Sequence, residues 1–230
     1  MTLLIYKDQG VCPKSALLLG RFLKKIEKNI LFVTSEELKN KQWMQKARLI
    51  VFPGGQDIFY HQKLSGKAND WIYEFVSKGG SYLGICAGAY FGTAFVEFDK
   101  GGALEVLQKR ELQFFPGKSI GPVLGVYQYG SEIGAKTLKI KTEKTSFFSY
   151  YNGGCFFENA HKYKSIEVIG RYEELPDKPA AIIRTTIGKG KVILSGVHLE
   201  YESHKKSSWD QDLKSTEDLR NSFFRSLLYP

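Results

Sequence analysis

At residues 79–92 the sequence reads Gly79-Gly80-Ser81-Tyr82-Leu83-Gly84-Ile85-Cys86-Ala87-Gly88-Ala89-Tyr90-Phe91-Gly92. The mostly apolar run from 81 to 85 predicts a buried strand. The pattern Gly-x-Cys-x-Gly, at residues 84–88, begins at the end of this strand and continues past it. This pattern is the nucleophile elbow of hydrolases with cysteine in place of serine. A nucleophile on a tight strand-to-helix turn has a strained backbone conformation. Glycines two residues before it and two after it have no Cβ atom, so neighbouring backbone can come close to the turn. The pattern predicts that Cys86 lies at the N-terminus of the next helix, where the helix dipole favours a thiolate.

A buried core residue is the alternative interpretation of Cys86. Cysteine is among the most buried residue types, and its presence in a core needs no chemical role. A short pattern of this kind also occurs by chance. A catalytic role therefore requires a base, a carboxylate and a second glycine loop elsewhere in the chain.

The composition is that of a globular protein with a sizeable core. The 230 residues are 43% hydrophobic, which is ordinary for such a protein, and no apolar run has the length of a membrane span. The first residues lack a basic region and a cleavage site, so we expect a first strand there and no signal peptide. Cys12, Cys86 and Cys155 form no Cys-x-x-Cys pair. The sequence therefore predicts no metal, no cofactor, no membrane partner and a reducing, cytoplasmic setting.

The chain is basic, with a formal net charge of +9 from 33 basic and 24 acidic residues. Such a charge is compatible with nucleic-acid binding. However, the lysines are scattered, and the sequence has neither a compact basic stretch nor an RNA-binding aromatic motif. We expect a solvated basic surface and no nucleic-acid partner.

Strand-like and helix-like segments alternate four times in the first part of the chain. Short apolar runs predict strands at 2–6, 30–33, 48–52 and 81–85. Capped or amphipathic segments predict helices at 13–28, 36–46, 67–78 and 87–95. The alternation predicts an α/β fold with a parallel sheet and helices on both faces. In such sheets the ligand crevice lies outside the carboxyl ends of the strands, where Cys86 would lie.

The second half of the chain has a different pattern. From about 96 to 184, short β-like runs alternate with glycine turns, which predicts a β-rich insertion in the α/β core. The predicted strands are 95–98, 111–115, 138–141, 147–151, 166–172 and 180–186. A hairpin turn at 187–191 leads into a last core strand at 191–197, and a terminal helix is predicted at 210–228. Because no linker interrupts the sequence, we expect one domain over residues 1–230.

His198 and Glu200 follow the last predicted core strand directly. A thiolate nucleophile needs an imidazole to move a proton, and the imidazole needs a carboxylate to hold its tautomer. A spacing of two can place both side chains on one side of an extended segment. Glu202 is the competing carboxylate, and a strand-end histidine with a solvated acid is the alternative interpretation. The remaining histidines, which are weaker candidates for the catalytic base, are His61, His161 and His204.

An acyl-transfer site also needs hydrogen-bond donors for the developing oxyanion. The backbone N–H of Ala87, directly after the nucleophile, is one candidate. The second comes from the Pro53-Gly54-Gly55 loop at the end of the third strand, where Gly54 or Gly55 can expose an N–H group. A plain turn is the alternative interpretation of this loop.

Together these residues resemble the class I glutamine amidotransferase superfamily, and more closely the N-terminal amidotransferase-like domain of biotin–protein ligases in its stand-alone bacterial form. The matching stretches are 51–57, 79–91, 111–117 and 196–200. The resemblance implies a flavodoxin-like sheet, a Cys86–His198–Glu200 triad, and an oxyanion loop at Gly54 and Gly55. It also implies a substrate pocket beside the nucleophile, for which we name Gln56, Asp57 and Tyr90.

Two departures from the superfamily pattern leave two hypotheses open. Tyr90 occupies the position where these glutaminases usually have a glutamine that helps to hold substrate. The 230 residues also include neither a synthetase domain nor a biotin-ligase catalytic domain. The first hypothesis is an enzyme for a small-molecule amide or acyl substrate. The second is a non-catalytic binding or regulatory module with a protein partner, in which the tyrosines of the insertion line a pocket or pack in the core: Tyr127, Tyr129, Tyr150 and Tyr151.

Overall fold

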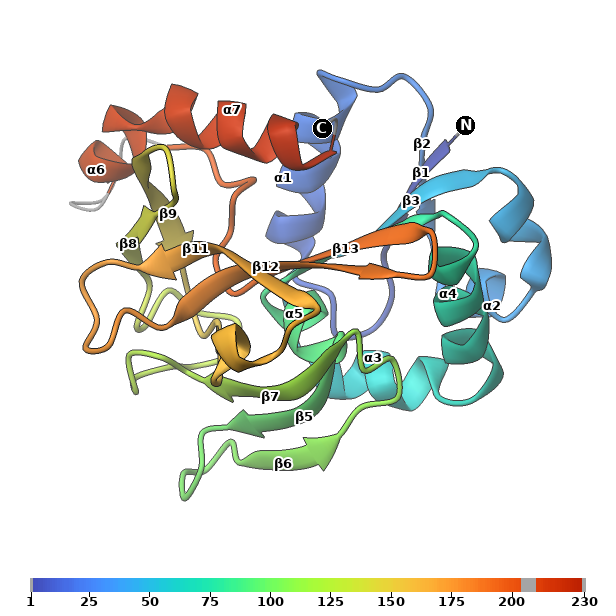
Figure 1. Ribbon diagram of the computed structural model, residues 1–230, viewed down its shortest axis with the longest axis horizontal. Helices are drawn as coiled ribbons and strands as arrows, with labels where there is room; N and C mark the ends of the chain where they lie inside the picture. Colours follow the sequence, from blue (N-terminus) through green and yellow to red (C-terminus); the bar gives the residue numbers. More distant parts are fainter. Residues whose placement is uncertain (1, 204–209, 229–230) are drawn as a thin grey trace.

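A computed structural model describes residues 2–203 and 210–228, and a large mixed sheet forms its centre (Figure 1). Five adjacent strands are parallel, in the order β2-β1-β3-β4-β13. Their bounds are β1 (Thr2–Tyr6), β2 (Ile30–Val33), β3 (Ala47–Phe52), β4 (Ser81–Ile85) and β13 (Gly190–Ser195). All five strands coincide closely with predicted core strands. The parallel α/β fold expected from the alternation is therefore confirmed.

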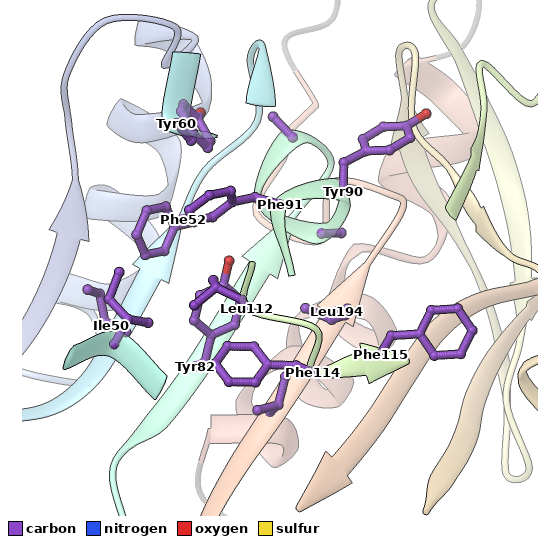
Figure 2. Close-up of a cluster of buried hydrophobic side chains, with 14 of the residues drawn as sticks. Ile50, Phe52, Tyr60, Tyr82, Tyr90, Phe91, Leu112, Phe114, Phe115 and Leu194 are labelled. Atoms are coloured by element: carbon purple, nitrogen blue, oxygen red, sulfur yellow. The ribbon is translucent and has the colours of Figure 1, made fainter. Parts of the chain in front are cut away.

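Helices cover both faces of the parallel strands, as Figure 1 shows. On one face lie α1 (Pro13–Lys24) and α7 (Glu217–Leu228), where Phe22 stacks on Phe224. On the other lie α3 (Asp57–Leu64), α4 (Lys67–Ser77) and α5 (Ala87–Phe91). Alternate residues of a strand point to opposite faces, so in β3 Val51 packs with α1 while Phe52 packs with α3 and α5. Figure 2 shows the aromatic cluster on this second face, around Phe52, Tyr82 and Phe91.

The β-rich segment extends the same sheet. β12 (Ala180–Ile187) runs antiparallel to β13, and the order continues β12-β10-β7-β5-β6. The bounds are β5 (Thr93–Phe98), β6 (Val106–Lys109), β7 (Phe115–Gly121) and β10 (Phe156–Phe157). A branch from β12 holds β11 (Ile166–Tyr172), β8 (Lys136–Lys141) and β9 (Ser146–Tyr151). The strand predicted at 111–115 is wrong, because β7 begins only at Phe115 while Leu112 and Phe114 are buried in a connection.

Several predicted helices are shorter than expected. The helix predicted at 36–46 is α2 (Ser35–Leu38) followed by the 3₁₀ helix η1 (Lys41–Gln45). Thr34 caps α2 through a capping box with Glu37, and Asn40 caps η1 separately. α5 ends at Phe91 instead of continuing to 95, because the residues after Gly92 form β5. The terminal helix is divided into α6 (Asp210–Ser215) and α7. Several elements were not predicted: the helices α3 and η2, a 3₁₀ helix (Ala160–Lys162), and the strands β6, β10 and all of β7 beyond Phe115.

The three cysteines, Cys12, Cys86 and Cys155, are free thiols. Across the described ranges, no group of three or more metal-ligating side chains could hold a metal ion. In the same ranges, no helix combines the length and the apolar character that crossing a membrane would require.

Candidate active site

Cys86 lies between β4 and α5 in the strained conformation that the elbow pattern predicts. Its φ of 50° and ψ of −104° are unusual for a residue with a Cβ atom. Its N–H donates to the carbonyl of Ser195 at 2.8 Å, which ties the elbow to β13. A Cβ atom on Gly84 would lie 2.2 Å from the Gly88 oxygen, and one on Gly88 would lie 2.1 Å from the Phe52 oxygen. Both glycines are therefore required by close backbone contacts.

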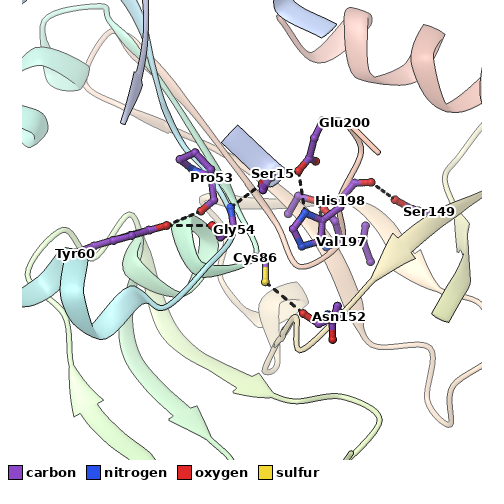
Figure 3. Close-up of polar contacts among 11 residues, drawn as sticks. Ser15, Pro53, Gly54, Tyr60, Cys86, Ser149, Asn152, Val197, His198 and Glu200 are labelled. Carbon is purple, nitrogen blue, oxygen red and sulfur yellow. Dashed lines mark hydrogen bonds and ion pairs between the residues drawn. The ribbon is translucent and has the colours of Figure 1, made fainter. Parts of the chain in front are cut away.

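His198 and Glu200 lie at the end of β13, beside this elbow (Figure 3). His198 Nδ1 and Glu200 Oε1 are 2.8 Å apart, and both side chains are buried. The backbone N–H of His198 donates to the Tyr150 carbonyl, and the Ser149 hydroxyl donates to the His198 carbonyl. β9, from the β-rich segment, therefore fixes the position of the imidazole. In Figure 3 the imidazole lies between the Glu200 carboxylate and the Cys86 sulfur.

Ser15 in α1 connects this pair to the glycine loop after β3. Its hydroxyl donates to Glu200 Oε1 at 2.8 Å and accepts from the Gly54 N–H at 3.0 Å. The sequence prediction that Gly54 supplies an oxyanion donor is therefore wrong for this structure, because Ser15 already occupies that N–H. Gly54 has a different importance, since a Cβ atom there would lie 2.5 Å from His198 Cε1.

The electrostatics of His198 reflect its neighbours. Burial lowers the pKa of the ring, but the charge of Glu200 and the interactions with the Cys86 and Glu200 side chains outweigh burial and hold the pKa well above 6.5. Glu202 is paired instead with Lys25, at 2.7 Å. Glu200 is thus the carboxylate that contacts His198.

The other two candidate oxyanion donors are the backbone N–H groups of Gly55, which lines the cavity with Cys86, and of Ala87, the residue after Cys86. Within the part of the chain that the structure describes, the N–H groups of Gly55 and Ala87 have no hydrogen-bond acceptor. Gly55 has a φ of +147°, and a Cβ atom on it would lie 2.0 Å from the Gly10 oxygen. Only glycine fits this position, which holds the loop close to the segment before α1.

A cavity of about 610 Å³ opens at this end of the sheet. Cys86 and His198 line it together with Gln56 and Gly55. Three of the four tyrosines suggested for a pocket also line it, namely Tyr127, Tyr129 and Tyr150. Tyr151 does not, because it is buried with its hydroxyl donating to the Gly154 carbonyl.

Two residues predicted for the substrate pocket lie elsewhere. Asp57 begins α3 and forms a buried ion pair with Arg110 at 2.7 Å; burial raises the pKa of its carboxyl although Arg110 opposes the rise. Tyr90 is buried beneath the elbow, where its hydroxyl donates to the Gly153 carbonyl and its ring packs edge-on against Phe98. Both side chains are buried and outside the cavity lining, so their part in a pocket is not supported.

Sequence reasoning missed Ser15, Lys14, Tyr201 and Asn152, which also line the cavity. The Asn152 carbonyl lies 3.8 Å from the Cys86 sulfur. His61 and His161 lie outside the described cavity lining: burial lowers the pKa of His61, and His161 lies in η2. The third remaining histidine, His204, is outside the described residues.

This architecture defines the class I glutamine amidotransferase-like fold, and two solved structures from Thermotoga maritima share it. The structure of PurLQS superimposes with a TM-score of 0.66 at 15% identity, covering 99% of this chain and 97% of that chain. A glutamine amidotransferase gives a TM-score of 0.54 at 14% identity, covering 99% and 96%. At these identities the likeness concerns the fold alone.

The chain belongs to the family described as "Biotin-protein ligase, N terminal", whose model matches residues 1–229. A protein of Chlamydia muridarum described as uncharacterized is 39% identical over 207 residues, which cover 86% of this chain and 80% of that protein. A biotin–protein ligase of Schizosaccharomyces pombe is 38% identical over 179 residues, which cover 75% of this chain. The match spans only 28% of the yeast ligase.

Proposed function

We propose that this chain is a cysteine-dependent amidohydrolase or acyl transferase that acts on a small-molecule amide or other acyl compound. One observation carries the proposal: an imidazole that lies beside Cys86 in the wall of a cavity is hydrogen-bonded to a buried carboxylate. Nucleophile, base and orienting acid are the three groups that acyl transfer by a thiol requires.

In the proposed reaction His198 holds the proton of the Cys86 thiol while the sulfur attacks the substrate carbonyl carbon, and a carbon–sulfur bond forms. The N–H groups of Gly55 and Ala87 hold the oxyanion of the tetrahedral intermediate. The bond to the leaving group breaks, and His198 gives that group the proton it needs. Water, or an amine acceptor, then attacks the thioester while His198 accepts its proton. The acyl product leaves and the thiol is restored, with Glu200 orienting His198 throughout.

Alkylation by iodoacetamide near neutral pH, read by peptide mass spectrometry, tests the proposed chemistry. We expect Cys86 to react at least about tenfold faster than a free cysteine peptide, and His198→Ala to remove this advantage. Cys155 is an internal control, since burial raises the pKa of its thiol. If Cys86 reacts no faster than the peptide and His198→Ala leaves its rate of alkylation unchanged, the proposal is refuted.

A non-catalytic binding or regulatory module is the second candidate. It is favoured by the match to one segment of a larger biotin–protein ligase and by Tyr90, which is buried at the position where the superfamily usually has a substrate-holding glutamine. This candidate predicts ligand binding at the cavity without turnover. Turnover of any small amide that disappears in Cys86→Ser contradicts it.

A further inference from the structure

The walls of the cavity at Cys86 are rich in tyrosine. Tyr150 and Tyr201 stack face to face, with ring centroids 3.7 Å apart and planes 2° apart. Tyr127 and Tyr129 pack edge to face at 4.9 Å, supported from behind by Phe98. These four rings come from three separate segments of the chain, and all four line the same space as Cys86 and His198.

The charges of the cavity are compensated within it. Besides His198, the charged side chains of the described lining are Lys14 and Glu132, which pair with each other at 3.1 Å. Lys14 also lies over the Tyr201 ring, 4.8 Å from its centroid. A free amino acid such as glutamine carries an ammonium and a carboxylate, and each needs an opposite charge when it is desolvated. Apart from His198, which the proposed reaction uses, this lining supplies neither charge without breaking the Lys14–Glu132 pair, whose side chains are 41% and 59% exposed.

The lining does offer aromatic faces and neutral hydrogen-bond donors. In the described ranges, the hydroxyls of Tyr127 and Tyr129 have no hydrogen-bond partner in the protein. Burial raises the pKa of both phenols above the usual value of 10, so they remain O–H donors at neutral pH. Tyrosine rings favour offset-stacked or edge-on contacts with other rings. An uncharged planar group with an acceptor atom fits these properties.

We propose that the acyl group accepted by this cavity is uncharged and contains a planar ring, so that the substrate is an amide or ester of a ring-bearing carboxylic acid and not free glutamine. This inference rests on the proposed function, because it names the substrate class of the same site. Cys86 attacks the carbonyl carbon of this acyl group, while the ring lies among the four tyrosines.

Two assays separate the pocket from the chemistry. The first measures turnover of p-nitroanilides with one leaving group and three acyl groups: 3-phenylpropanoyl, nonanoyl of the same carbon number, and γ-L-glutamyl. The second measures calorimetric binding of the three corresponding primary amides to Cys86→Ser, which needs no turnover. If Cys86 fails the alkylation test above but the phenyl amide still binds selectively, only the proposed chemistry is rejected. If Cys86 is alkylated rapidly but shows no preference for the phenyl compound, only the proposed substrate class is rejected.

We expect the phenyl compound to exceed the other two by about tenfold in either assay, the size of a favourable aromatic contact. Tyr127→Leu combined with Tyr129→Leu removes this preference, whereas the double phenylalanine variant keeps the stacking part of it. Tyr73→Leu is the matched control, since Tyr73 is exposed on α4 and packs on Phe114 away from the cavity. A phenyl compound that binds to Cys86→Ser no better than the nonanoyl or glutamyl compound, or does not bind, overturns the proposal.

Discussion

Gly54→Ala tests the geometry of the site with the smallest possible change. The added Cβ atom would lie 2.5 Å from His198 Cε1 and 3.2 Å from Nε2, whereas real Cβ contacts are essentially never under 3.0 Å. The imidazole or the loop must therefore move by at least 3.0 − 2.5 = 0.5 Å. Because a displacement of about 1 Å at a catalytic group can cost about 100-fold in rate, we expect a loss of tenfold or more.

The assay is the rate of Cys86 alkylation by iodoacetamide, together with turnover wherever a substrate has been found. Gly54 has no positive φ, so its replacement adds no backbone strain, and the expected loss comes from contact with His198. Gly101→Ala is the control: it has a φ of +78° and open space around it, so it costs about 1 kcal/mol of stability without changing Cys86. If Gly54→Ala folds and alkylates at the wild-type rate, His198 does not act on the sulfur in the way we describe.

Three further predictions follow from the buried polar groups. Ser15→Ala removes a hydrogen bond to a buried carboxylate and leaves the Gly54 N–H unpaired, so we expect a loss of about 1–3 kcal/mol of stability in urea unfolding and slower alkylation of Cys86. Ser15→Thr keeps the hydroxyl and should retain more of the stability and of the alkylation rate. If Ser15→Ala changes neither quantity, the hydrogen bonds of Ser15 do not support the site. The pKa of His198 is raised above 6.5 on folding, so its protonation stabilises the fold fully below pH 6.5, and this contribution is lost as pH rises through the raised value. The wild-type protein should therefore exceed His198→Gln in stability by more at pH 6 than at pH 9. A stability difference that grows with pH would refute the raised pKa. Arg110→Met leaves Asp57 buried without its cation and should lower the free energy of unfolding, measured in urea, by about 3–5 kcal/mol. Arg184→Met removes an exposed ion pair with Glu167 and should change stability little. Equal effects of the two substitutions would show that burial of the ion pair is unimportant.

Hydrophobic periodicity and turn residues specified most of the fold. The parallel strands and the helices α1 and α4 follow from local patterns. Burial on one face of a helix leaves apolar residues at helical spacing, and burial on both faces of a strand leaves a short continuous apolar run. The predictions at 36–46 and 87–95 were too long because separate caps and the start of β5 end these helices early. α3 has a weak apolar pattern, since only three of its side chains are buried, so nothing local indicated it.

The sequence by itself determined the cysteine elbow and the spacing of His198 and Glu200, because these depend on neighbours within a few residues. Only the tertiary structure decided that Ser15 bonds to a carboxylate 185 positions away, that Gly54 donates to Ser15, and that Asp57 and Tyr90 are buried away from the cavity. It also decided that Glu200, and not Glu202, contacts the imidazole. Such contacts depend on how α1, β9 and β13 pack in space, and packing between distant segments leaves no fixed spacing in the sequence that could be recognised beforehand.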